Sequence, residues 1–147
     1  MKILLKNLQR RRRLNKAKII KSAVKILSLL EQHEAELSIL FVGDRRMSQL
    51  NAAYRGKRKS TDVLSFEADI PFRESDQPPV LGDIVISVPK AESQAEMSGS
   101  GFYAEVERLL IHGSLHLLQY DHEESDYKAR LMRKKEKEIS DALKKVV

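Results

Sequence analysis

Three of the four histidines in this 147-residue chain lie close together, at positions 112, 116 and 122. Two residues four apart share one face of a helix, so His112 and His116 can reach the same small ion. His122 lies too far along the chain for that face, and we expect a turn after Leu118 to bring it back. The three imidazole nitrogens would then surround an ion with an open fourth position, as in catalytic zinc sites.

One zinc ion is the cofactor that this pattern favours. Neutral imidazole nitrogens suit zinc, the chain has no cysteine, and no carboxylate-rich cluster favours magnesium or calcium. Nickel and copper use the same ligands, so the pattern predicts the site more sharply than the ion. The remaining histidine, His33, lies at the polar end of an expected helix and is interpreted as a surface residue.

The histidine spacing equals that of the metzincin peptidases, H-E-x-x-H-x-x-G-x-x-H. In those enzymes the glutamate after the first histidine is the general base, but Gly113 stands there in this chain and transfers no proton. Gln119 replaces the turn glycine, so it either takes a left-handed conformation at a cost of about 1–2 kcal/mol or changes the turn. We therefore expect a metzincin-like three-histidine metal cup without the usual peptidase chemistry.

The composition predicts one domain over residues 1–147, located in the cytoplasm. There is no cysteine for disulfides, no apolar stretch long enough to cross a membrane, and no signal-peptide pattern. The net charge is +6, with no acidic residue before Glu31 and a second basic cluster at 55–59. Such clusters suit a polyanion such as RNA, although a solvated surface explains them equally well.

Hydrophobic periodicity predicts an α+β fold in which about five helices pack on a four-stranded mixed sheet. Asp44 is a candidate N-cap, and Pro89 suits the first turn of a helix. A long irregular connection is expected over 68–81. The expected strands are 2–6, 36–42, 63–66 and 82–88, and the expected helices are 16–34, 44–54, 89–97, 102–118 and 124–144.

Apolar residues at helical spacing mark the faces that two of these helices should bury. The face of the first helix comprises Ile19, Ile20, Ala23, Val24, Leu27 and Leu30. The core stripe of the histidine helix comprises Phe102, Val106, Leu109, Leu110, Gly113 and Leu117. His112 and His116 fall at the edge of that stripe.

Three ordered motifs resemble the YbeY endoribonuclease family. The segment 112–122, HGSLHLLQYDH, matches the family pattern H-G-x-L-H-L-x-G-Y-D-H in all but the second glycine. The segment 51–66 resembles its N-x-x-Y-R-x-x-x-x-x-T-D-V-L-S-F block, and 81–87 resembles its L-G-D-I-x-I strand. The resemblance implies a metal-dependent endonuclease for single-stranded RNA, with His112, His116 and His122 as ligands and Arg55 as the functional arginine.

The resemblance also implies a role in maturation of the 3′ end of small-subunit rRNA and in ribosome quality control. The expected partners are single-stranded RNA and the small ribosomal subunit, without a membrane and without DNA. Two rival interpretations remain: a metal-dependent peptidase or other hydrolase on the same site, and a non-catalytic, ribosome-associated protein with a structural zinc. In the latter, the basic N-terminal stretch would be the main rRNA-binding surface.

Arg55 is the catalytic candidate, because a guanidinium can pair two phosphate oxygens and the charge that develops on them. From the residues alone it is equally well a surface arginine of a basic loop, and the family resemblance is what favours the catalytic role. The basic run 57–59 would bind flanking phosphates without reading sequence. No general base stands out, and the sequence does not decide between water and a ribose 2′-hydroxyl as the nucleophile. Asp121 could orient a histidine, and Tyr120 could stack a base or belong to the core. The weaker candidates for supporting roles are Thr61, Asp62, Ser65, Tyr120 and Asp121.

Overall fold

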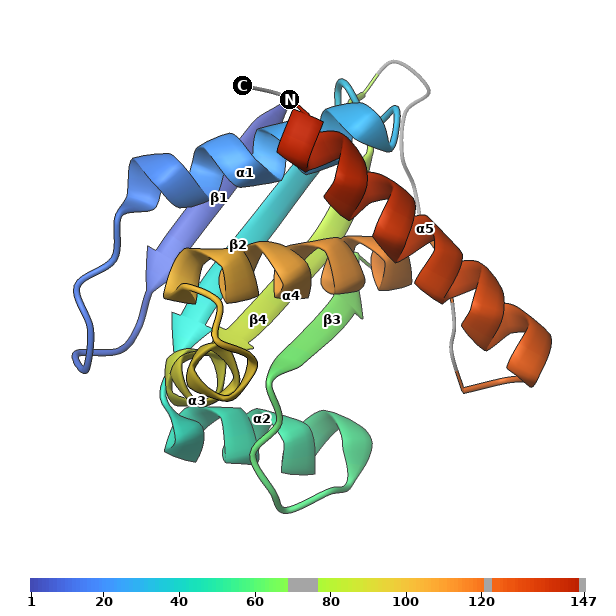
Figure 1. Ribbon diagram of the computed structural model, residues 1–147. Helices are drawn as coiled ribbons and strands as arrows, with labels where there is room; N and C mark the ends of the chain where they lie inside the picture. The colour runs from blue at the N-terminus through green and yellow to red at the C-terminus, as the bar shows by residue number, and fades with distance from the viewer. Residues whose placement is uncertain (69–76, 121–122, 146–147) are drawn as a thin grey trace.

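The computed structural model describes residues 1–68, 77–120 and 123–145 (Figure 1). Within these ranges the order of elements agrees with the sequence expectation. The strands are β1 (Lys2–Asn7), β2 (Glu36–Val42), β3 (Val63–Glu67) and β4 (Val80–Ser87). The helices are α1 (Lys16–Leu29), α2 (Asp44–Arg55), α3 (Val88–Ser98), α4 (Phe102–Leu117) and α5 (Asp126–Lys145).

The four strands form one mixed sheet in the order β1-β2-β4-β3. β1, β2 and β4 run parallel, and β3 pairs antiparallel with β4. Ile39 at the middle of β2 lies between Leu5 on β1 and Ile84 on β4. This confirms the four-stranded mixed sheet, and it leaves β3 at one edge of it.

Alternation along the strands divides the apolar residues between two faces. One face carries Leu37, Ile39 and Phe41 of β2 with Ile84 and Ile86 of β4, all fully or almost fully buried. Helices α1, α4 and α5 cover this face, and α4 crosses its centre (Figure 1). The predicted core residues of α4 are all buried there, which fixes the rotation of the helix about its axis.

The second face of the sheet is covered mainly at one end, by α2. Val42, Met47, Leu64 and Val85 form a small core between this helix and the strands. Farther along, Leu4 on β1 is 42% exposed. The second face therefore combines a packed end beside α2 with an open end beside β1.

Some boundaries differ from the sequence expectation. α1 ends at Leu29 rather than residue 34, because Glu31 has φ 60° and the chain reverses to enter β2. Its buried face includes Ile26, which belongs to the main core, whereas Val24 is 38% exposed. β4 begins at Val80, because its parallel pairing with β2 includes Glu36 opposite Val80, beyond the expected start.

Asp44 is not the N-cap of α2. Gly43 takes that position, and the Asp44 carboxylate instead accepts hydrogen bonds from the hydroxyls of Ser60 (2.9 Å) and Ser87 (3.1 Å). Asp44 thus ties the loop before β3 to the end of β4. No helix in the described ranges is both long and apolar enough to cross a membrane.

Candidate functional site

Gly113 allows α4 to lie directly on the sheet beside β3 and β4. A Cβ atom at this position would be 3.0 Å from Ile84 Cγ2 and 3.1 Å from Ser65 Oγ, both tighter than ordinary van der Waals contact. The Ser65 hydroxyl donates to the Gly113 carbonyl at 3.1 Å. A glutamate side chain, which metzincin peptidases carry at this position, would therefore displace the helix from the sheet.

His112 and His116 converge on one point, as their spacing predicts. Their Nε2 atoms are 3.2 Å apart and their rings meet edge to face at 71°. Two nitrogens on a tetrahedral zinc, each about 2.05 Å from the metal, are separated by about 3.3 Å. The pair therefore fits a shared zinc ion, although the same distance also suits a hydrogen bond between the rings.

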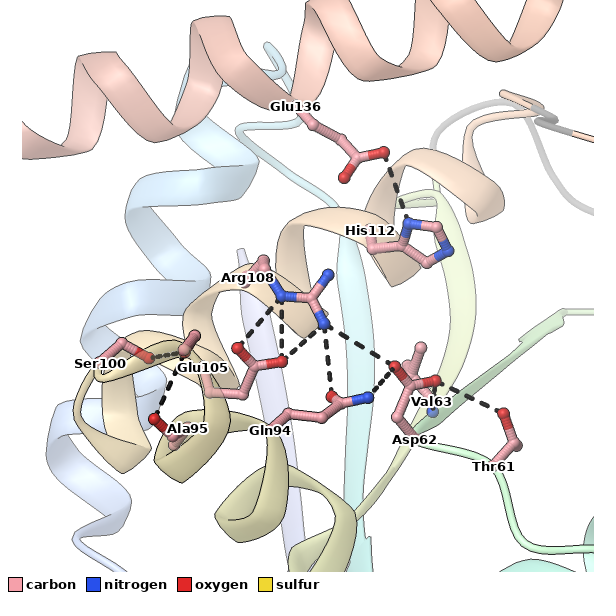
Figure 2. A network of polar contacts seen from close by, with 11 residues as sticks. Thr61, Asp62, Val63, Gln94, Ala95, Ser100, Glu105, Arg108, His112 and Glu136 are labelled. Carbon is pink, nitrogen blue, oxygen red and sulfur yellow. Dashed lines mark hydrogen bonds and ion pairs between the residues drawn. The ribbon is translucent and has the colours of Figure 1, made fainter. Parts of the chain in front are cut away.

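Glu136 on α5 faces the other nitrogen of the first histidine. Its Oε1 atom lies 3.5 Å from Nδ1 of His112 (Figure 2). A carboxylate on this side favours the tautomer with the proton on Nδ1, so Nε2 keeps its lone pair and faces His116. Helix α5 thus supplies an orienting group of the kind that commonly accompanies metal-binding histidines.

The turn after α4 keeps the geometry of a glycine turn although glutamine occupies it. Gln119 has φ 75°, its N–H donates to His116 O at 3.0 Å, and the Tyr120 N–H donates to Leu115 O at 2.9 Å. These two bonds form a Schellman motif. Gln119 therefore takes the left-handed option, and its side-chain amide donates to Glu67 on β3 at 2.6 Å.

Two residues of the expected site, Asp121 and His122, lie outside the described residues. Among the residues that are described, no group of three histidine, aspartate or glutamate side chains is placed to hold a metal ion. The two histidines thus lie together as their spacing predicts. Their role as metal ligands, the third ligand and the complete cup stay predictions.

A cleft of about 910 Å³ opens beside the two histidines and crosses the edge strand β3. The histidines and the turn after α4 form one wall, and the last turn of α2 with the loop that follows it forms the other. Ser65 and Phe66, from opposite faces of β3, both line it. The cleft therefore brings together the histidine helix, the basic loop and the edge strand, which carry two of the three family motifs, 51–66 and 112–122.

Arg55, Lys57 and Lys59 place positive charge along this cleft. The Arg55 side chain is 39% exposed, and its Nη2 atom lies 3.6 Å from Oε1 of Glu123, which is itself 63% exposed. Of the basic run that the sequence assigned to flanking phosphates, Lys57 and Lys59 line the cleft, whereas Arg58 is not one of the described lining residues. Two of these three side chains thus lie in the cleft, and their binding of flanking phosphates stays a prediction.

Asn51 holds the basic loop in this place. It is buried, and its Nδ2 atom donates to the Lys59 carbonyl at 2.8 Å. The loop leaves α2 through Gly56, whose φ of 69° is the left-handed conformation that closes a helix without strain in glycine. A helix-to-loop hydrogen bond and a glycine cap therefore position Arg55, Lys57 and Lys59 on one side of the cleft.

Asp62 is engaged in a polar network, which argues against a role as general base. Its Oδ1 atom accepts from the Val63 N–H at 2.8 Å, and Oδ2 accepts from Gln94 at 3.2 Å (Figure 2). The Arg108 guanidinium lies 3.8 Å from the same carboxylate. It also forms a bidentate pair with the buried carboxylate of Glu105. The hydrogen bonds to Glu105 raise the pKa of the guanidinium. The network fastens the start of β3 to α3 and α4.

Tyr120, for which the sequence left base stacking and core packing open, is partly buried and packs against the main core while lining the cleft. Sequence reasoning missed Asn51, Tyr54 and Glu136. The first two stand inside the N-x-x-Y-R segment, so the motif contained them without showing their tasks. Glu136 carried no local signal, because its proximity to His112 depends on how α5 crosses α4.

Comparison with known proteins shows the family of the chain. A family model described as endoribonuclease YbeY matches residues 4–144. The chain belongs to the YbeY family of endoribonucleases. The resemblance expected from three motifs is thus confirmed, and it extends over the N-terminal third, where the sequence alone carried little family information.

Individual relatives support the assignment over nearly the full length of the chain. Endoribonuclease YbeY of Thermodesulfovibrio yellowstonii is 40% identical over 94% of both chains. The Desulforamulus reducens YbeY protein is 42% identical over 97% of both chains. A Thermotoga maritima protein with a known solution structure is 25% identical in sequence, and the two structures superpose with a TM-score of 0.62. The match covers 94% of this chain and 86% of that chain. YbeY membership therefore agrees with the α+β fold as well as with the sequence.

Proposed function

We propose that this chain is a metal-dependent endoribonuclease that cuts single-stranded RNA in the cleft beside His112 and His116. Membership of an endoribonuclease family supports RNA as the substrate and phosphodiester cleavage as the reaction. The observation that carries the site assignment is the 3.2 Å separation of the two Nε2 atoms next to a basic cleft. His122 completes the proposed ligand set.

One Zn²⁺ is the proposed cofactor, because two described imidazoles fit its coordination distance and a third follows in the sequence. When bound, zinc supplies a Lewis acid and lowers the pKa of a bound water to about 7. The residues of the chain then have separate tasks: Glu136 orients His112, and Gly113 leaves room for close packing. The absence of a glutamate at position 113 argues against the rival peptidase.

Arg55 is proposed to bind the phosphate that is cut. Its guanidinium is partly exposed in the cleft, and the present partner, Glu123, is a solvated carboxylate at 3.6 Å. An exposed ion pair of this kind contributes about 1 kcal/mol or less, so a phosphate can replace the carboxylate at little cost. Paired oxygens on the guanidinium would stabilise the negative charge that develops during cleavage.

The biological role proposed for this activity is maturation of the 3′ end of small-subunit rRNA, with ribosome quality control. The small ribosomal subunit is the proposed partner, and the cytoplasm the proposed location. The positive net charge of +6 supports a nucleic-acid partner. A single domain over residues 1–147 is proposed to carry the whole activity.

The decisive test measures metal content and RNA cleavage on the same preparations. We expect wild-type protein to hold one zinc per chain and to cut single-stranded RNA but not casein. His116→Ala should lose zinc and cleavage together, whereas His33→Ala, at an exposed histidine in the turn between α1 and β2, should retain both. Zinc-loaded wild-type protein that leaves single-stranded RNA intact would contradict the proposal.

A structural zinc would give a different result. In that case His116→Ala would lower the free energy of unfolding and remove the metal, and the wild-type protein would bind RNA without cutting it. Glu136→Gln offers a finer measurement, because loss of the orienting carboxylate should weaken zinc affinity by about 10-fold or more. Chelator competition measures this affinity without reference to activity.

A further inference from the structure

Tyr54 is a large aromatic side chain that the fold leaves in solvent. It lies in the last turn of α2, directly before Arg55, and it is 68% exposed. An aromatic ring stabilises a fold mainly through the apolar area that it buries. Most of the surface of Tyr54 stays in solvent, so it contributes little in this way. Its position is nevertheless defined, because the ring centroid lies 4.8 Å from that of Phe66 on β3, with 57° between the planes.

Tyr54 and Phe66 stand on a ridge between two hollows. Both side chains line the cleft that contains the histidines. Both also line a second hollow of about 390 Å³ on the open part of the second sheet face, where Leu4, Leu40 and Leu50 are among the lining residues. A chain that leaves the cleft across the edge strand β3 would therefore pass over this ridge.

The surroundings of the ridge match the needs of a single-stranded nucleic acid. Proteins that bind single strands combine a basic groove for the phosphates with aromatic rings on which bases stack. Arg55, Lys57 and Lys59 supply the charge in the same cleft, within five residues of Tyr54. A peptide of neutral or basic character would gain little from these cations, so charge complementarity favours RNA.

We propose that the Tyr54 ring, backed by Phe66, is the platform on which one base of single-stranded RNA stacks while its phosphates pass along Arg55, Lys57 and Lys59. This inference rests on the proposed function and adds a base-binding position to it. Stacking uses the face of the ring, so it tolerates any base and explains neither the site of cleavage nor a sequence preference. The second hollow lies where the neighbouring base would emerge.

The test compares RNA binding by variants of the full-length, zinc-loaded protein. The probe is a short fluorescent single-stranded RNA, checked by gel to remain intact during the titration. We expect Tyr54→Ala to weaken binding by about 5- to 150-fold, the range for losing one stacked base. Tyr54→Phe keeps the ring and should stay within about twofold of wild type.

Tyr127 provides a matched control. It is 63% exposed on α5 and is not one of the described residues that line the cleft, so Tyr127→Ala should bind RNA as wild type does. Stacking also predicts a specific dependence on salt. Tyr54→Ala should lower affinity equally at all salt concentrations, because no phosphate contact and no counterion release is lost.

An abasic RNA of the same length separates stacking from other effects. Without bases, wild-type protein and Tyr54→Ala should bind equally, because the platform has nothing to hold. Equal binding of normal RNA by wild type and Tyr54→Ala would overturn the platform and leave the proposed nuclease intact. Failure of the wild-type protein to bind any single-stranded RNA would overturn both.

Discussion

The two arginine-rich segments of this chain face different surroundings. In the segment 10–13, Arg11 and Arg12 bind the carboxylate of Glu92 on α3 at 2.6 and 3.1 Å, and the Arg12 guanidinium lies 4.0 Å from the centre of the Phe102 ring. In the segment 55–59, Arg55, Lys57 and Lys59 line a cleft beside two histidines. Two segments that look alike in sequence thus differ in role. One is held to α3 by ion pairs, and the other lines an open cleft.

The two segments differ in how closely their arginines pair with carboxylates and in how exposed those carboxylates are. Glu92 is 26% exposed and serves two arginines, whereas Glu123 is 63% exposed and lies 3.6 Å from Arg55. A less solvated carboxylate with closer partners is harder to exchange for phosphate. We therefore expect substitutions in the segment 10–13 to change stability, and substitutions in 55–59 to change RNA binding and cleavage.

The largest expected effect is that of Arg55→Ala. It should lower kcat/KM for single-stranded RNA by about 10²- to 10³-fold, because a positioned donor for developing charge is lost. Arg11→Ala is the matched control and should stay within about twofold. Both variants must retain zinc by elemental analysis. Equal losses in the two variants would erase the distinction between the segments.

The next effect concerns the salt dependence of RNA binding. Replacing Lys57 and Lys59 together with alanine should reduce the slope of log affinity against log salt by about 1.4, since each phosphate contact on a single strand contributes about 0.7. The Asn51 hydrogen bond to the Lys59 backbone survives this change. The paired control, alanine at Arg10 and Arg13, should leave the slope unchanged, and a comparable reduction there would make the N-terminal stretch an RNA-binding surface.

Asn51→Ala tests whether the position of the loop matters as well as its charge. Loss of the buried hydrogen bond to Lys59 should lower the free energy of unfolding by about 1–2 kcal/mol in urea titrations. RNA affinity should fall too, although no cation is removed. Arg12→Ala should cost about 1 kcal/mol of stability through its ion pair and ring contact, with affinity unchanged. Loss of stability without loss of affinity in Asn51→Ala would contradict this role.

The smallest effect concerns Glu92 and pH. The hydrogen bond from Arg11 holds the pKa of Glu92 below its ordinary value of 4.5, so its contribution to stability is present above that value and disappears as pH falls through the lower, folded-state pKa. Glu92→Gln should therefore cost at most about 1 kcal/mol at neutral pH. The difference in Tm from wild type should close on acidification, and a difference that persists in strong acid would contradict the ion-pair explanation.

Much of this structure could be predicted from local sequence patterns, because the interactions behind those patterns are themselves local. The spacing of His112 and His116 is a property of any helix, and the apolar stripe of α4 fixed which way the two rings could face. β2 was predicted at its observed bounds, since Gly43 and Asp44 mark its end in the sequence. The end of α1 was missed, because a chain reversal after Leu29 is imposed by the need to enter β2.

The turn at Gln119 lies between these cases. The sequence presented two options, a strained left-handed residue or a different turn, and a local pattern does not choose between them. The structure takes the left-handed option, with a Schellman pair of backbone bonds and a side-chain bond to Glu67 on β3. The bond to a residue far away in sequence helps to offset the local cost.

By itself the sequence determined the fold class, the family and the meeting of two imidazoles, because periodicity, ordered motifs and helical spacing are written along the chain. Tertiary structure alone decided that Glu136 reaches His112, that Asp62 is occupied by Gln94 and Arg108, and that Phe66 supports Tyr54. Those pairs are brought together by the crossing of α5 over α4 and by the pairing of β3 with β4. Contacts between elements depend on packing of the whole core, which no local pattern records.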